Sequence, residues 1–448
     1  MNLGVIGAGY VGLTTGICLS SLGHKITIYD LVDEKIKLIS EKKLPFYEKD
    51  LEELLDKTIS SQNLIPTSNI DEMIKNTDGC FICVGTPSQQ NNSIDLSQVL
   101  SSIKLVCEHL KKLQKNDYVI MIRSTIVPSS TKSHILPMVN QILDNSSYGL
   151  CLIPEFLREG EAVSDFMNPD KIVIGSINLK SEVFAKKIFE SFNQATILTT
   201  NPETAEMIKY ANNAFFSMLI SFSNEIANIA EKTTGIDTFE VLRALVEDKR
   251  ITTKIQDQKI KPGLESYLLP GCGFGGSCFP KDVRAILQYA SAKNVNTPLL
   301  NAVMEINDER PSLIISLAEK LLLSLKNKHV TILGLTFKPD TDDIRSSPAF
   351  EAIRLLNDKE AKVFAYDPNL SNDSSKNKFT SFTLCSTLES SIENSDLVIL
   401  FTKWNEFKNL DQNILDKFMN SPLLIDGRGF LDSSKFDENV YHKIGFTK

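Results

Sequence analysis

Residues 2–30 read NLGVIGAGYVGLTTGICLSSLGHKITIYD, and this stretch decides the fold of the N-terminal part of the chain. An apolar run that suits a β-strand is followed by a glycine turn, a helical stretch and a second apolar strand. Gly7, Gly9 and Gly12 form the pattern G-x-G-x-x-G, and Asp30 closes the second strand 18 residues after Gly12. The strand, the turn, the helix and the acid together predict a Rossmann-type dinucleotide-binding unit.

The glycine turn predicts how a dinucleotide is held. Gly7 permits the tight turn, Gly9 lets backbone amides approach the pyrophosphate, and Gly12 lets the helix pack closely on the strand. A carboxylate at Asp30 accepts a hydrogen bond from a ribose 2′-hydroxyl and repels a 2′-phosphate, so the cofactor is expected to be NAD rather than NADP. The cofactor-binding residues expected in the turn are Gly7, Gly9, Tyr10, Val11 and Gly12.

Two further strands are expected in GCFICVGTP (residues 79–87) and DYVIMIRSTIVP (residues 117–128). Both runs end in small or hydroxyl residues, and the carboxyl ends of parallel strands are where such sheets usually bind a ligand. Thr86, Ser124 and Thr125 are therefore candidates for contact with the cofactor. The alternative for these hydroxyl groups is ordinary capping of the strand ends.

One long helix is predicted over about residues 203–233, because apolar side chains recur there at three- and four-residue steps and Gly235 stands just past the end. At 1.5 Å per residue this helix is about 45 Å long, enough to bridge two domains and to carry a dimer seam. Lys209 and Asn213, four residues apart, project from one side of it. A solvated helix face is the alternative interpretation of this pair.

The order of strand, helix and strand returns after residue 327, in KHVTILGLTF, SPAFEAIRLLNDKEA and KVFAYDP, with further strands in SDLVILFT and PLLIDGRG. This pattern predicts a second Rossmann-like half. Its loop GLTFKPDTDDIR (residues 334–345) has a single glycine and lacks a close backbone cradle for a pyrophosphate, so we expect it to hold a nucleotide other than a second NAD. Lys338 and Arg345 would supply positive charge there; solvated surface cations are the alternative.

The stretch GFGGSCFPKD (residues 273–282) places one thiol behind three glycines. A cysteine is usually a small hydrophobic residue of a core, and this remains the alternative for Cys278. Pro280, however, suits the first turn of a helix, which places Cys278 near a helix N-terminus with Lys281 close by. Both features stabilise a thiolate, so the context favours a nucleophile.

The composition is that of an ordinary soluble globular protein: the chain has 448 residues, 42% hydrophobic and 23% charged, which suggests roughly three domains. A net charge of −8 without a basic cluster speaks against nucleic acid as a partner. The chain enters a strand at once and contains no long apolar run, so neither a leader peptide nor membrane association is expected. These features predict a cytoplasmic protein.

The eight cysteines are expected to be reduced thiols, because no leader peptide is apparent. Cys80 and Cys83 form a single CxxC, but on a buried strand residues three apart point to opposite faces. The five histidines are scattered singly along the chain. No metal site is therefore expected.

NAD together with a nucleophilic cysteine suggests a particular reaction, the oxidation of an aldehyde to an acid through a thiohemiacetal and a thioester on the sulfur. The second nucleotide-binding half suggests that the reacting carbonyl belongs to a nucleotide-linked substrate.

The chain resembles the UDP-glucose/GDP-mannose dehydrogenases over nearly its whole length, and within that family most closely the members that act on UDP-glucose. The resemblance rests on GAGYVGL, PFYE, CVGTP, RSTIVP, PEFLREGEAVSDFMNPDKIVIG, EMIKYANNAFF, GFGGSCFPKD, LGLTFKPDTDDIRSSP and DGRG. It implies an α/β fold of two doubly wound Rossmann-like domains joined by a long central helix and a helical middle domain. The implied boundaries are residues 1–200 for the NAD-binding domain, 201–300 for the central domain and 301–448 for the UDP-binding domain.

The reaction that the resemblance implies is a four-electron oxidation of the C6 alcohol of a nucleotide sugar to a uronic acid, UDP-glucose to UDP-glucuronate, by a homodimer that serves polysaccharide synthesis. The catalytic residues implied are Cys278, Lys209, Asn213, Asp282, Glu155 and Thr125. The cofactor contacts implied beyond the glycine turn are Asp30, Lys35, Thr86, Ser124, Thr125, Glu159, Lys281 and Arg345. The substrate contacts implied are Glu155, Phe156, Leu157, Arg158, Glu159, Lys209, Asn213, Arg250, Tyr267, Leu268, Leu269, Pro270, Gly271, Gly275, Lys338 and Arg428.

The sequence departs from the family pattern at several places. Ile153 stands where the family usually has asparagine, and YEKDLEELL replaces the usual proline and glycine after PFYE. Between Arg250, which such enzymes lend across a dimer interface, and Tyr267 the spacer is longer than usual, which bears on the shape of the sugar pocket.

Three alternatives stay open at this point. The first is the same chemistry on GDP-mannose or a UDP-N-acetylhexosamine. The second is a single-step hydroxyacid dehydrogenase of the 6-phosphogluconate type, which needs no Cys278. The third is an NAD-binding sensor or assembly protein without catalysis.

Overall fold

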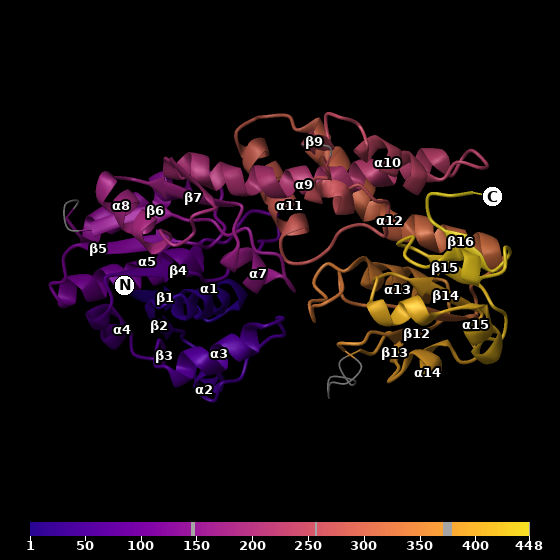
Figure 1. Ribbon diagram of the computed structural model, residues 1–448, viewed down its shortest axis with the longest axis horizontal. Coiled ribbons are helices and arrows are strands. Elements are labelled where there is room, and N and C mark those ends of the chain that lie inside the picture. Colours follow the sequence, from indigo (N-terminus) through magenta and orange to yellow (C-terminus); the bar gives the residue numbers. More distant parts are fainter. Residues whose placement is uncertain (145–147, 256–257, 371–378, 448) are drawn as a thin grey trace. The chain divides into compact units, whose positions relative to one another are not determined.

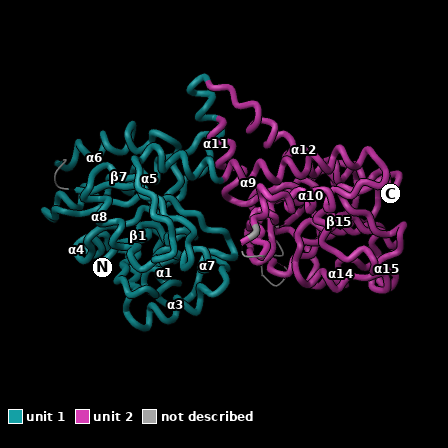
Figure 2. The backbone as a smooth tube through the Cα atoms, turned by 45° about the horizontal axis from the view of Figure 1, so that its top comes forward, with its two compact units in different colours: residues 1–212, 288–294 teal, residues 213–287, 295–448 magenta. Residues whose placement is uncertain are grey.

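The computed structural model describes residues 1–144, 148–255, 258–370 and 379–447 (Figure 1). The chain forms two compact units, coloured separately in Figure 2. The N-terminal unit comprises residues 1–212 and 288–294, and the C-terminal unit comprises residues 213–287 and 295–448. Helices α9 (Pro202–Ala230) and α11 (Phe279–Ala292) each pass from one unit into the other.

The N-terminal unit is built on an eight-stranded sheet in the order β3-β2-β1-β4-β5-β6-β7-β8. Neighbouring strands are parallel except β6 and β7, which are antiparallel. The predicted Rossmann-type unit is confirmed. The strands are β1 (Asn2–Ile6), β2 (Lys25–Tyr29), β3 (Leu64–Thr67), β4 (Gly79–Ile82), β5 (Tyr118–Ile122), β6 (Tyr148–Leu152), β7 (Lys171–Ser176) and β8 (Thr196–Thr200). The helices are α1 (Tyr10–Ser21), α2 (Asp33–Ser40), α3 (Leu51–Ser60), α4 (Ile70–Asn76), α5 (Ser97–Lys112), α6 (Leu136–Ile142), α7 (Ala162–Met167) and α8 (Leu179–Ile188).

Two apolar clusters cover the two faces of this sheet, as expected when helices pack on both sides of parallel strands. Alternate residues of each strand enter different clusters because successive side chains point to opposite faces. Cys83 belongs to the cluster that contains Leu13 of α1, whereas Cys80 belongs to the cluster that contains Val106 of α5. The prediction that these two thiols point to opposite faces is confirmed.

The C-terminal unit contains a six-stranded parallel sheet in the order β13-β12-β11-β14-β15-β16, which confirms the second Rossmann-like half. A short antiparallel pair of strands precedes α11. The strands are β9 (Thr253–Ile255), β10 (Gln258–Ile260), β11 (His329–Leu333), β12 (Lys362–Tyr366), β13 (Thr383–Leu384), β14 (Leu397–Leu400), β15 (Leu424–Asp426) and β16 (Tyr441–Lys443). The helices, apart from α9 and α11, are α10 (Thr238–Val246), α12 (Pro298–Leu322), α13 (Pro348–Asp358), α14 (Leu388–Ile392) and α15 (Gln412–Phe418).

The long helix predicted over residues 203–233 is confirmed as α9, which has 29 residues. It begins where Asn201 Oδ1 accepts the backbone N–H of Thr204 at 2.8 Å, and Pro202 fills the first helical position, where no N–H is needed. It ends at Ala230, shortly before Gly235, whose φ of 88° lies in the left-handed region.

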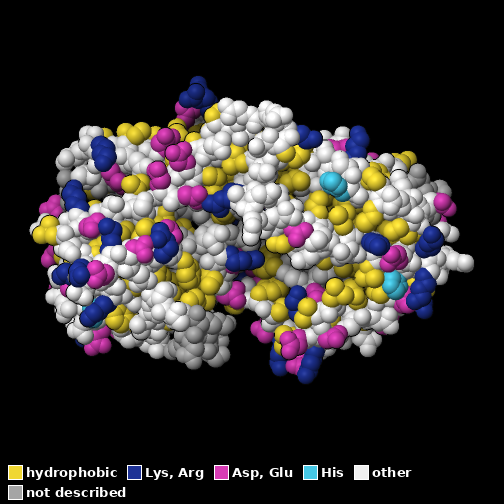
Figure 3. All heavy atoms as spheres, turned by 180° about the vertical axis from the view of Figure 1, so that it is seen from behind, with side chains coloured by type: hydrophobic (Ala, Val, Ile, Leu, Met, Phe, Trp, Pro, Cys, Tyr) yellow, Lys and Arg dark blue, Asp and Glu magenta, His cyan; other side chains and the backbone are white. Residues whose placement is uncertain are grey.

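No helix within the described ranges is long and apolar enough to cross a membrane. On the face drawn in Figure 3, basic side chains are interspersed with acidic ones rather than gathered in a patch of one sign.

The first turns of α9 contain a buried carboxyl that makes the protein sensitive to pH. Glu206 is 1% exposed, and its Oε1 accepts the backbone N–H and the hydroxyl of Thr131 at 2.9 and 2.6 Å. Burial raises the pKa of Glu206 to about 7, against a usual value of 4.5. Between these two pH values the folded chain keeps a proton that the unfolded chain has lost. The contribution of Glu206 to folding stability is therefore full below pH 4.5 and falls as the pH rises to 7.

We expect this single group to lower the free energy of unfolding by roughly 3 kcal/mol across that range. Urea unfolding of the whole chain at several pH values checks this, with Glu206→Gln compared against Glu225→Gln, an exposed carboxyl on the same helix, as the control. The Glu206→Gln variant should lose most of the pH dependence. An unchanged slope in that variant contradicts the prediction.

Candidate active site

The glycine turn after β1 has the geometry that the sequence predicts. Gly7 has a φ of 98°, and a Cβ there would lie 2.9 Å from the carbonyl oxygen of Cys83. A Cβ on Gly12 would collide with the backbone of Gly7, so α1 can pack this closely only with glycine at that position. Gly9 caps α1 through its carbonyl, which accepts the N–H of Leu13 at 2.9 Å, and no atom lies close to where its side chain would be. The turn therefore leaves its amides open to a pyrophosphate.

Asp30 lies directly after β2, beside this turn. Its Oδ2 accepts the N–H of Ala8 at 2.7 Å, and its Oδ1 accepts the N–H of Val32 at 2.9 Å. Lys35 approaches the same carboxylate at 3.4 Å. The two hydrogen bonds hold the carboxylate in place. Asp30 is 8% exposed, so part of it remains open to a ligand. This arrangement fits a carboxylate that accepts a hydrogen bond from a ribose hydroxyl.

The Asp30→Asn variant tests that role, because it keeps the size of the side chain and removes its charge. We expect NAD binding to weaken by about tenfold, as for the loss of a charged hydrogen bond, and discrimination against NADP to relax. Dissociation constants for NAD and NADP, measured by calorimetry, check this. Asp33→Asn, a change at the start of α2, should leave both constants unchanged. Undiminished preference for NAD in Asp30→Asn would contradict the assignment.

Glu48 ties the glycine turn to the loop that follows β6, and sequence reasoning missed it. Its carboxylate is 3% exposed and accepts hydrogen bonds from Tyr10 Oη at 2.5 Å, from the N–H of Gly160 at 2.7 Å and from the N–H of Ala162 at 2.9 Å. Because Gly160 follows Glu159, this one carboxylate positions two predicted cofactor contacts, Tyr10 and Glu159.

A buried ion pair lies in the N-terminal unit between Glu155, on the loop after β6, and Lys209 of α9. Lys209 Nζ donates to Glu155 Oε1 at 2.7 Å and to its carbonyl oxygen at 2.8 Å, and each side chain is 5% exposed. The N–H of Leu157 donates to the other carboxylate oxygen at 2.7 Å. The structure thus brings together two predicted catalytic residues that stand 54 positions apart in the sequence.

The groups around this pair keep Glu155 charged. The ammonium of Lys209 lies 5.5 Å from the centre of the Phe156 ring. Arg123, at the end of β5, is also buried. Burial raises the pKa of Glu155, but Lys209, the N–H of Leu157 and Arg123 together outweigh burial and lower that pKa. Glu155 is therefore ionised at neutral pH, and Arg123 is a contributor that sequence reasoning missed.

The predicted hydroxyl residues at the strand ends divide into two kinds. Ser124 Oγ donates to the carbonyl oxygen of Val84 at 2.6 Å and is buried, which is the capping alternative. Thr86 is 9% exposed and Thr125 is partly exposed, so both reach the carboxyl edge of the sheet.

Cys278 lies in the C-terminal unit, immediately before the first residue of α11. Its carbonyl oxygen accepts the N–H of Asp282 at 2.8 Å, which is the first intrahelical bond, so Cys278 is the N-cap residue. Its side chain is partly exposed, and the Ser277 hydroxyl lies 3.6 Å from its sulfur. The predicted position at a helix N-terminus is confirmed. All eight cysteines lie in the described part of the chain, and none is in a disulfide.

Asp282 in the first turn of α11 connects two more predicted residues. Its carboxylate is 1% exposed and accepts Asn213 Nδ2 at 2.6 Å and Lys281 Nζ at 2.5 Å. Asn213 and Lys209 are one turn apart on α9, as predicted. A side-chain cluster of amide, carboxylate and ammonium therefore surrounds the start of the helix that carries Cys278.

The glycine-rich loop before Cys278 packs against the loop after β11. The N–H of Gly276 donates to the carbonyl oxygen of Arg345 at 2.8 Å, and a Cβ on Gly275 would lie 2.4 Å from the carbonyl oxygen of Ser346. The guanidinium of Arg345 is held by two bonds of 2.8 Å to the carboxylate of Asp343. The glycines are thus needed for contact between two protein loops, in addition to any contact with a ligand.

A small cavity of about 100 Å³ lies at the carboxyl edge of the C-terminal sheet. Three cationic side chains contribute to its wall, Lys338, Lys403 and Arg428. Arg428 is fixed by bonds to the carbonyl oxygens of Phe401 at 2.6 Å and Gly273 at 3.2 Å. The protein packed around Lys403, and then the charge of Arg428, lower the pKa of Lys403. Lys338 and Arg428 were predicted; Lys403 was not, because a single lysine after a strand carries no distinguishing pattern.

The remaining predicted substrate residues of the C-terminal unit, apart from Arg250, lie in the segment 267–271. Leu269 and Pro270 line the cavity, and the N–H of Gly271 is held by Asn224 Oδ1 at 2.8 Å. Tyr267 packs its ring 4.5 Å from that of Phe216. Leu268 is buried. Arg250 has a side chain that is 84% exposed and is paired with Asp248, while Arg158 of the N-terminal unit is paired with Glu161 and Asp165.

Comparison with known proteins identifies the family of the chain. The model of the NAD-binding domain of the UDP-glucose/GDP-mannose dehydrogenase family matches residues 1–193, that of its central domain residues 203–309 and that of its UDP-binding domain residues 331–433. The chain belongs to the UDP-glucose/GDP-mannose dehydrogenase family. It is accordingly an enzyme, an NAD-dependent oxidoreductase, and the cofactor predicted from the glycine turn is confirmed.

Among its relatives, UDP-glucose 6-dehydrogenase of Rickettsia bellii is 38% identical and matches 100% of this chain and 98% of that protein. UDP-glucose 6-dehydrogenase TuaD of Bacillus subtilis is 34% identical over 99% of this chain and 93% of that protein. The structure of a UDP-glucose dehydrogenase from Pyrobaculum islandicum superimposes with a TM-score of 0.89 at 30% identity and covers 99% of this chain and 98% of that one. A UDP-D-MAnNAc dehydrogenase structure from Pyrococcus horikoshii gives 0.83 at 25% identity and covers 99% of each chain.

Proposed function

We propose that this dehydrogenase oxidises the C6 alcohol of UDP-glucose to the carboxylate of UDP-glucuronate, with Cys278 as the covalent nucleophile. The observation that carries the proposal is Cys278 at the N-cap of α11, where amide N–H groups at the helix end favour a thiolate. Bound NAD accepts a hydride in each of two oxidations.

The first oxidation turns the alcohol into an aldehyde. The C6 carbon gives up a hydride and its hydroxyl gives up a proton. Asp282 and Thr125 transfer that proton through a water molecule. The carboxylate of Asp282 accepts hydrogen bonds from Asn213 and Lys281. Lys209 and Asn213 donate hydrogen bonds to the oxygen that becomes negative.

The second oxidation takes place on the sulfur. Cys278 Sγ adds to the aldehyde carbon, and the oxygen takes up a proton, giving a thiohemiacetal. Loss of a second hydride and a proton leaves a thioester. Water then adds to the thioester carbonyl with help from Glu155, the carbon–sulfur bond breaks, and the acid and the thiol are released. Per sugar, two NAD are reduced and one water is consumed.

We assign the nucleotide of the substrate to the cavity lined by Lys338 and Arg428. A diphosphate carries charge that suits these cations, and Arg428 is oriented by two backbone carbonyls, so it presents a fixed fork. The apolar side chains of Leu269 and Pro270 in its wall suit the base of a nucleotide. For the sugar, the family resemblance implies contacts with Glu155–Glu159.

The experiment that tests this proposal counts NADH formed per sugar consumed for a panel of nucleotide sugars. We expect two NADH per UDP-glucose and a uronic acid as the product. A ratio of one would favour a single-step hydroxyacid dehydrogenase. Absence of turnover with every sugar would favour a protein that binds NAD without catalysis.

The same chemistry on a UDP-N-acetylhexosamine is the second candidate, because the structure of an enzyme named for UDP-D-MAnNAc superimposes with a TM-score of 0.83. GDP-mannose is a further alternative substrate for this chemistry. Turnover of only an acetamido sugar or of GDP-mannose in the same panel would reject UDP-glucose.

A homodimer is part of the proposal. Phe215, Phe222 and Ile229 stand seven residues apart on α9, and they are 47%, 40% and 63% exposed. Such a stripe of large apolar side chains on one helix suits a second copy of the chain. Light scattering should give twice the chain mass, and a Phe222→Lys variant should shift toward the single-chain mass. A single-chain mass for the unaltered protein would contradict the proposal.

The proposed place of action is the cytoplasm, which suits a protein whose cysteines are all thiols. The uronate would serve polysaccharide synthesis.

A further inference from the structure

In the N-terminal unit, three hydrogen bonds from backbone N–H groups connect the glycine turn with the end of β2. The N–H of Gly7 donates to the carbonyl oxygen of Tyr29 at 2.8 Å. Asp30, the next residue, accepts the N–H of Ala8 on Oδ2 at 2.7 Å and that of Val32 on Oδ1 at 2.9 Å. These bonds fix the carboxylate of Asp30, which follows β2, beside the glycine turn that follows β1.

The C-terminal unit repeats this set with different residues. The N–H of Gly334, whose φ is 88°, donates to the carbonyl oxygen of Tyr366 at 2.8 Å. Asp367 accepts the N–H of Leu335 on Oδ2 at 2.8 Å and that of Asn369 on Oδ1 at 3.0 Å. Asp367 is therefore the counterpart of Asp30, the carboxylate that binds the ribose of a dinucleotide.

The two carboxylates differ in what else they accept. Asp367 Oδ2 also accepts the N–H and the hydroxyl of Thr336, each at 3.0 Å, and the indole Nε1–H of Trp404 at 3.1 Å. Asp367 is fully buried, at 0% exposure, whereas Asp30 is 8% exposed. The oxygen that would accept a ribose hydroxyl is already supplied with protein donors.

Trp404 stands where the N-terminal unit has a small residue. Ile82 of β4 and Leu400 of β14 each pair with the last residue of the first strand in their sheet. Four positions beyond them lie Thr86 and Trp404. Thr86 therefore follows β4 in the N-terminal sheet, and Trp404 stands at the corresponding position after β14 in the C-terminal sheet.

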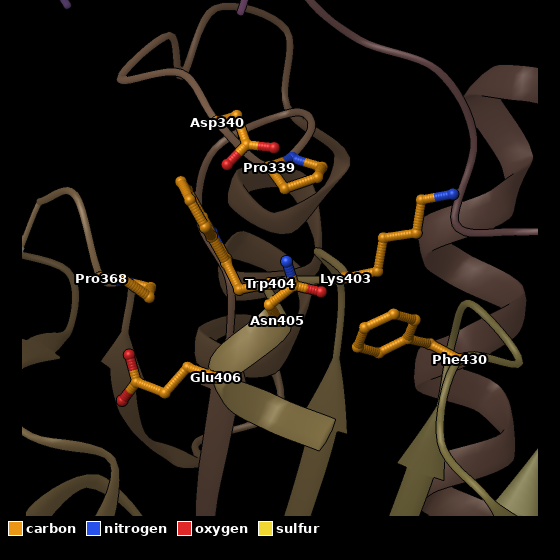
Figure 4. A pocket seen from close by; sticks show the side chains of 8 residues that line it. All are labelled: Pro339, Asp340, Pro368, Lys403, Trp404, Asn405, Glu406 and Phe430. Atoms are coloured by element: carbon orange, nitrogen blue, oxygen red, sulfur yellow. The ribbon is translucent and has the colours of Figure 1, made fainter. Parts of the chain in front are cut away.

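A cavity lies beside Trp404 at the end of the C-terminal sheet. In Figure 4 the indole rises from the end of β14, with Pro368 on one side and Pro339 on the other. These residues and Glu406 contribute to the wall of a cavity of about 370 Å³. Trp404 itself is 8% exposed and its Nε1–H donates to the buried Asp367, so its side chain contacts both this cavity and that carboxylate.

We propose that Trp404 is a specificity-determining residue that closes the adenosine half of a second dinucleotide site. Its ring occupies the space that an adenosine ribose takes beside Asp30, and its Nε1–H replaces the ribose hydroxyl as a donor to the acidic residue. The C-terminal sheet is thereby restricted to the substrate nucleotide, which we assigned to the adjoining cavity lined by Lys338 and Arg428. This inference rests on NAD binding to the N-terminal unit and not on the identity of the sugar.

The unaltered protein gives the first test, because Trp404 is the single tryptophan of the chain and its fluorescence reports on this place alone. With NAD present to fill the N-terminal site, we expect AMP to cause no saturable change in emission. Unfolding in urea, which exposes the indole, supplies the reference change. A saturable response to AMP in the folded enzyme would overturn the inference.

The second test exchanges the residue for its counterpart. With NADH saturating the N-terminal site, equilibrium dialysis of Trp404→Thr should detect one additional AMP per chain, against none in the unaltered enzyme. Trp404→Phe keeps the ring and loses the donor, and it should bind no additional AMP. A folded Trp404→Thr without the additional site, or a Trp404→Phe with it, would overturn the role given to the ring. Because the readout is binding of AMP, failure here leaves the proposed oxidation untouched.

Discussion

The Cys278→Ala variant should lose formation of the uronic acid by a factor on the order of 10³ or more while its affinity for NAD stays unchanged. Alanine cannot form the thiohemiacetal, so neither the second hydride transfer nor the thioester can follow. The cofactor turn belongs to the N-terminal unit, whereas Cys278 caps α11 in the C-terminal unit, so no cofactor-binding residue of that turn is altered. Product analysis and calorimetric titration with NAD together measure the two effects.

The serine variant separates nucleophilicity from geometry. Cys278→Ser keeps a nucleophile of similar shape and is expected to stall at an adduct or at the aldehyde, because a hydroxyl is a much weaker nucleophile than a thiolate at neutral pH. Intact mass during turnover should show the substrate attached to the unaltered enzyme. Cys385→Ala, a second partly exposed cysteine on the C-terminal unit, serves as the control and should retain full activity. Normal acid output from Cys278→Ala would refute the covalent mechanism.

The Lys209→Met variant should lose both activity and stability. Loss of a group that donates to the developing oxyanion is expected to lower kcat by about 10²- to 10³-fold. The change also leaves the buried carboxylate of Glu155 without its cation, which is expected to lower the free energy of unfolding by about 3–5 kcal/mol. Steady-state kinetics and urea unfolding measure the two effects.

The pH dependence of stability gives an independent check on this pair. In the unaltered protein the lowered pKa of Glu155 contributes stability above its usual value of 4.5, and this contribution is lost as the pH falls below that value. Without Lys209, burial dominates and raises the pKa of Glu155. The variant should then gain stability as the pH falls toward 4.5, which is the opposite sign.

Two further variants make the interpretation specific. Lys171→Met is the matched control, since Lys171 lies over the same Phe156 ring at 4.5 Å but is bonded to Asn212 instead of Glu155. The double variant Glu155→Gln with Lys209→Met removes both charges, so it should regain part of the lost stability and none of the lost activity. Additive losses in the double variant would show that the two residues do not act as a pair.

The short-range patterns of the sequence sufficed for the elements and for much of the site. The period of apolar residues predicted α9, because a helix depends on contacts within a few positions of the chain. The glycine turn with Asp30 predicted the dinucleotide unit, because Asp30 follows the turn at the spacing typical of a strand–turn–helix–strand unit, and Ala8 and Asp30 do bond across 22 positions. The N-cap position of Cys278 follows in the same way from Pro280 two residues later. The pairing of Glu155 with Lys209 was expected only through the family resemblance, since no periodicity connects residues so far apart.

Only the tertiary structure decided which polar groups form hydrogen bonds with one another in the buried interior. Glu48 holds the N–H of Gly160 across 112 positions of sequence, and Trp404 reaches Asp367 across 37. Glutamate and tryptophan carry no local pattern that foretells such partners, because the energy of a buried hydrogen bond depends on the crossing of distant segments and on the exclusion of water there. The sequence by itself therefore determined the two nucleotide folds, the cofactor turn of the first and the position of Cys278 at a helix N-terminus. Packing decided how Glu48 braces the first fold and which donors, Trp404 among them, surround Asp367 in the second.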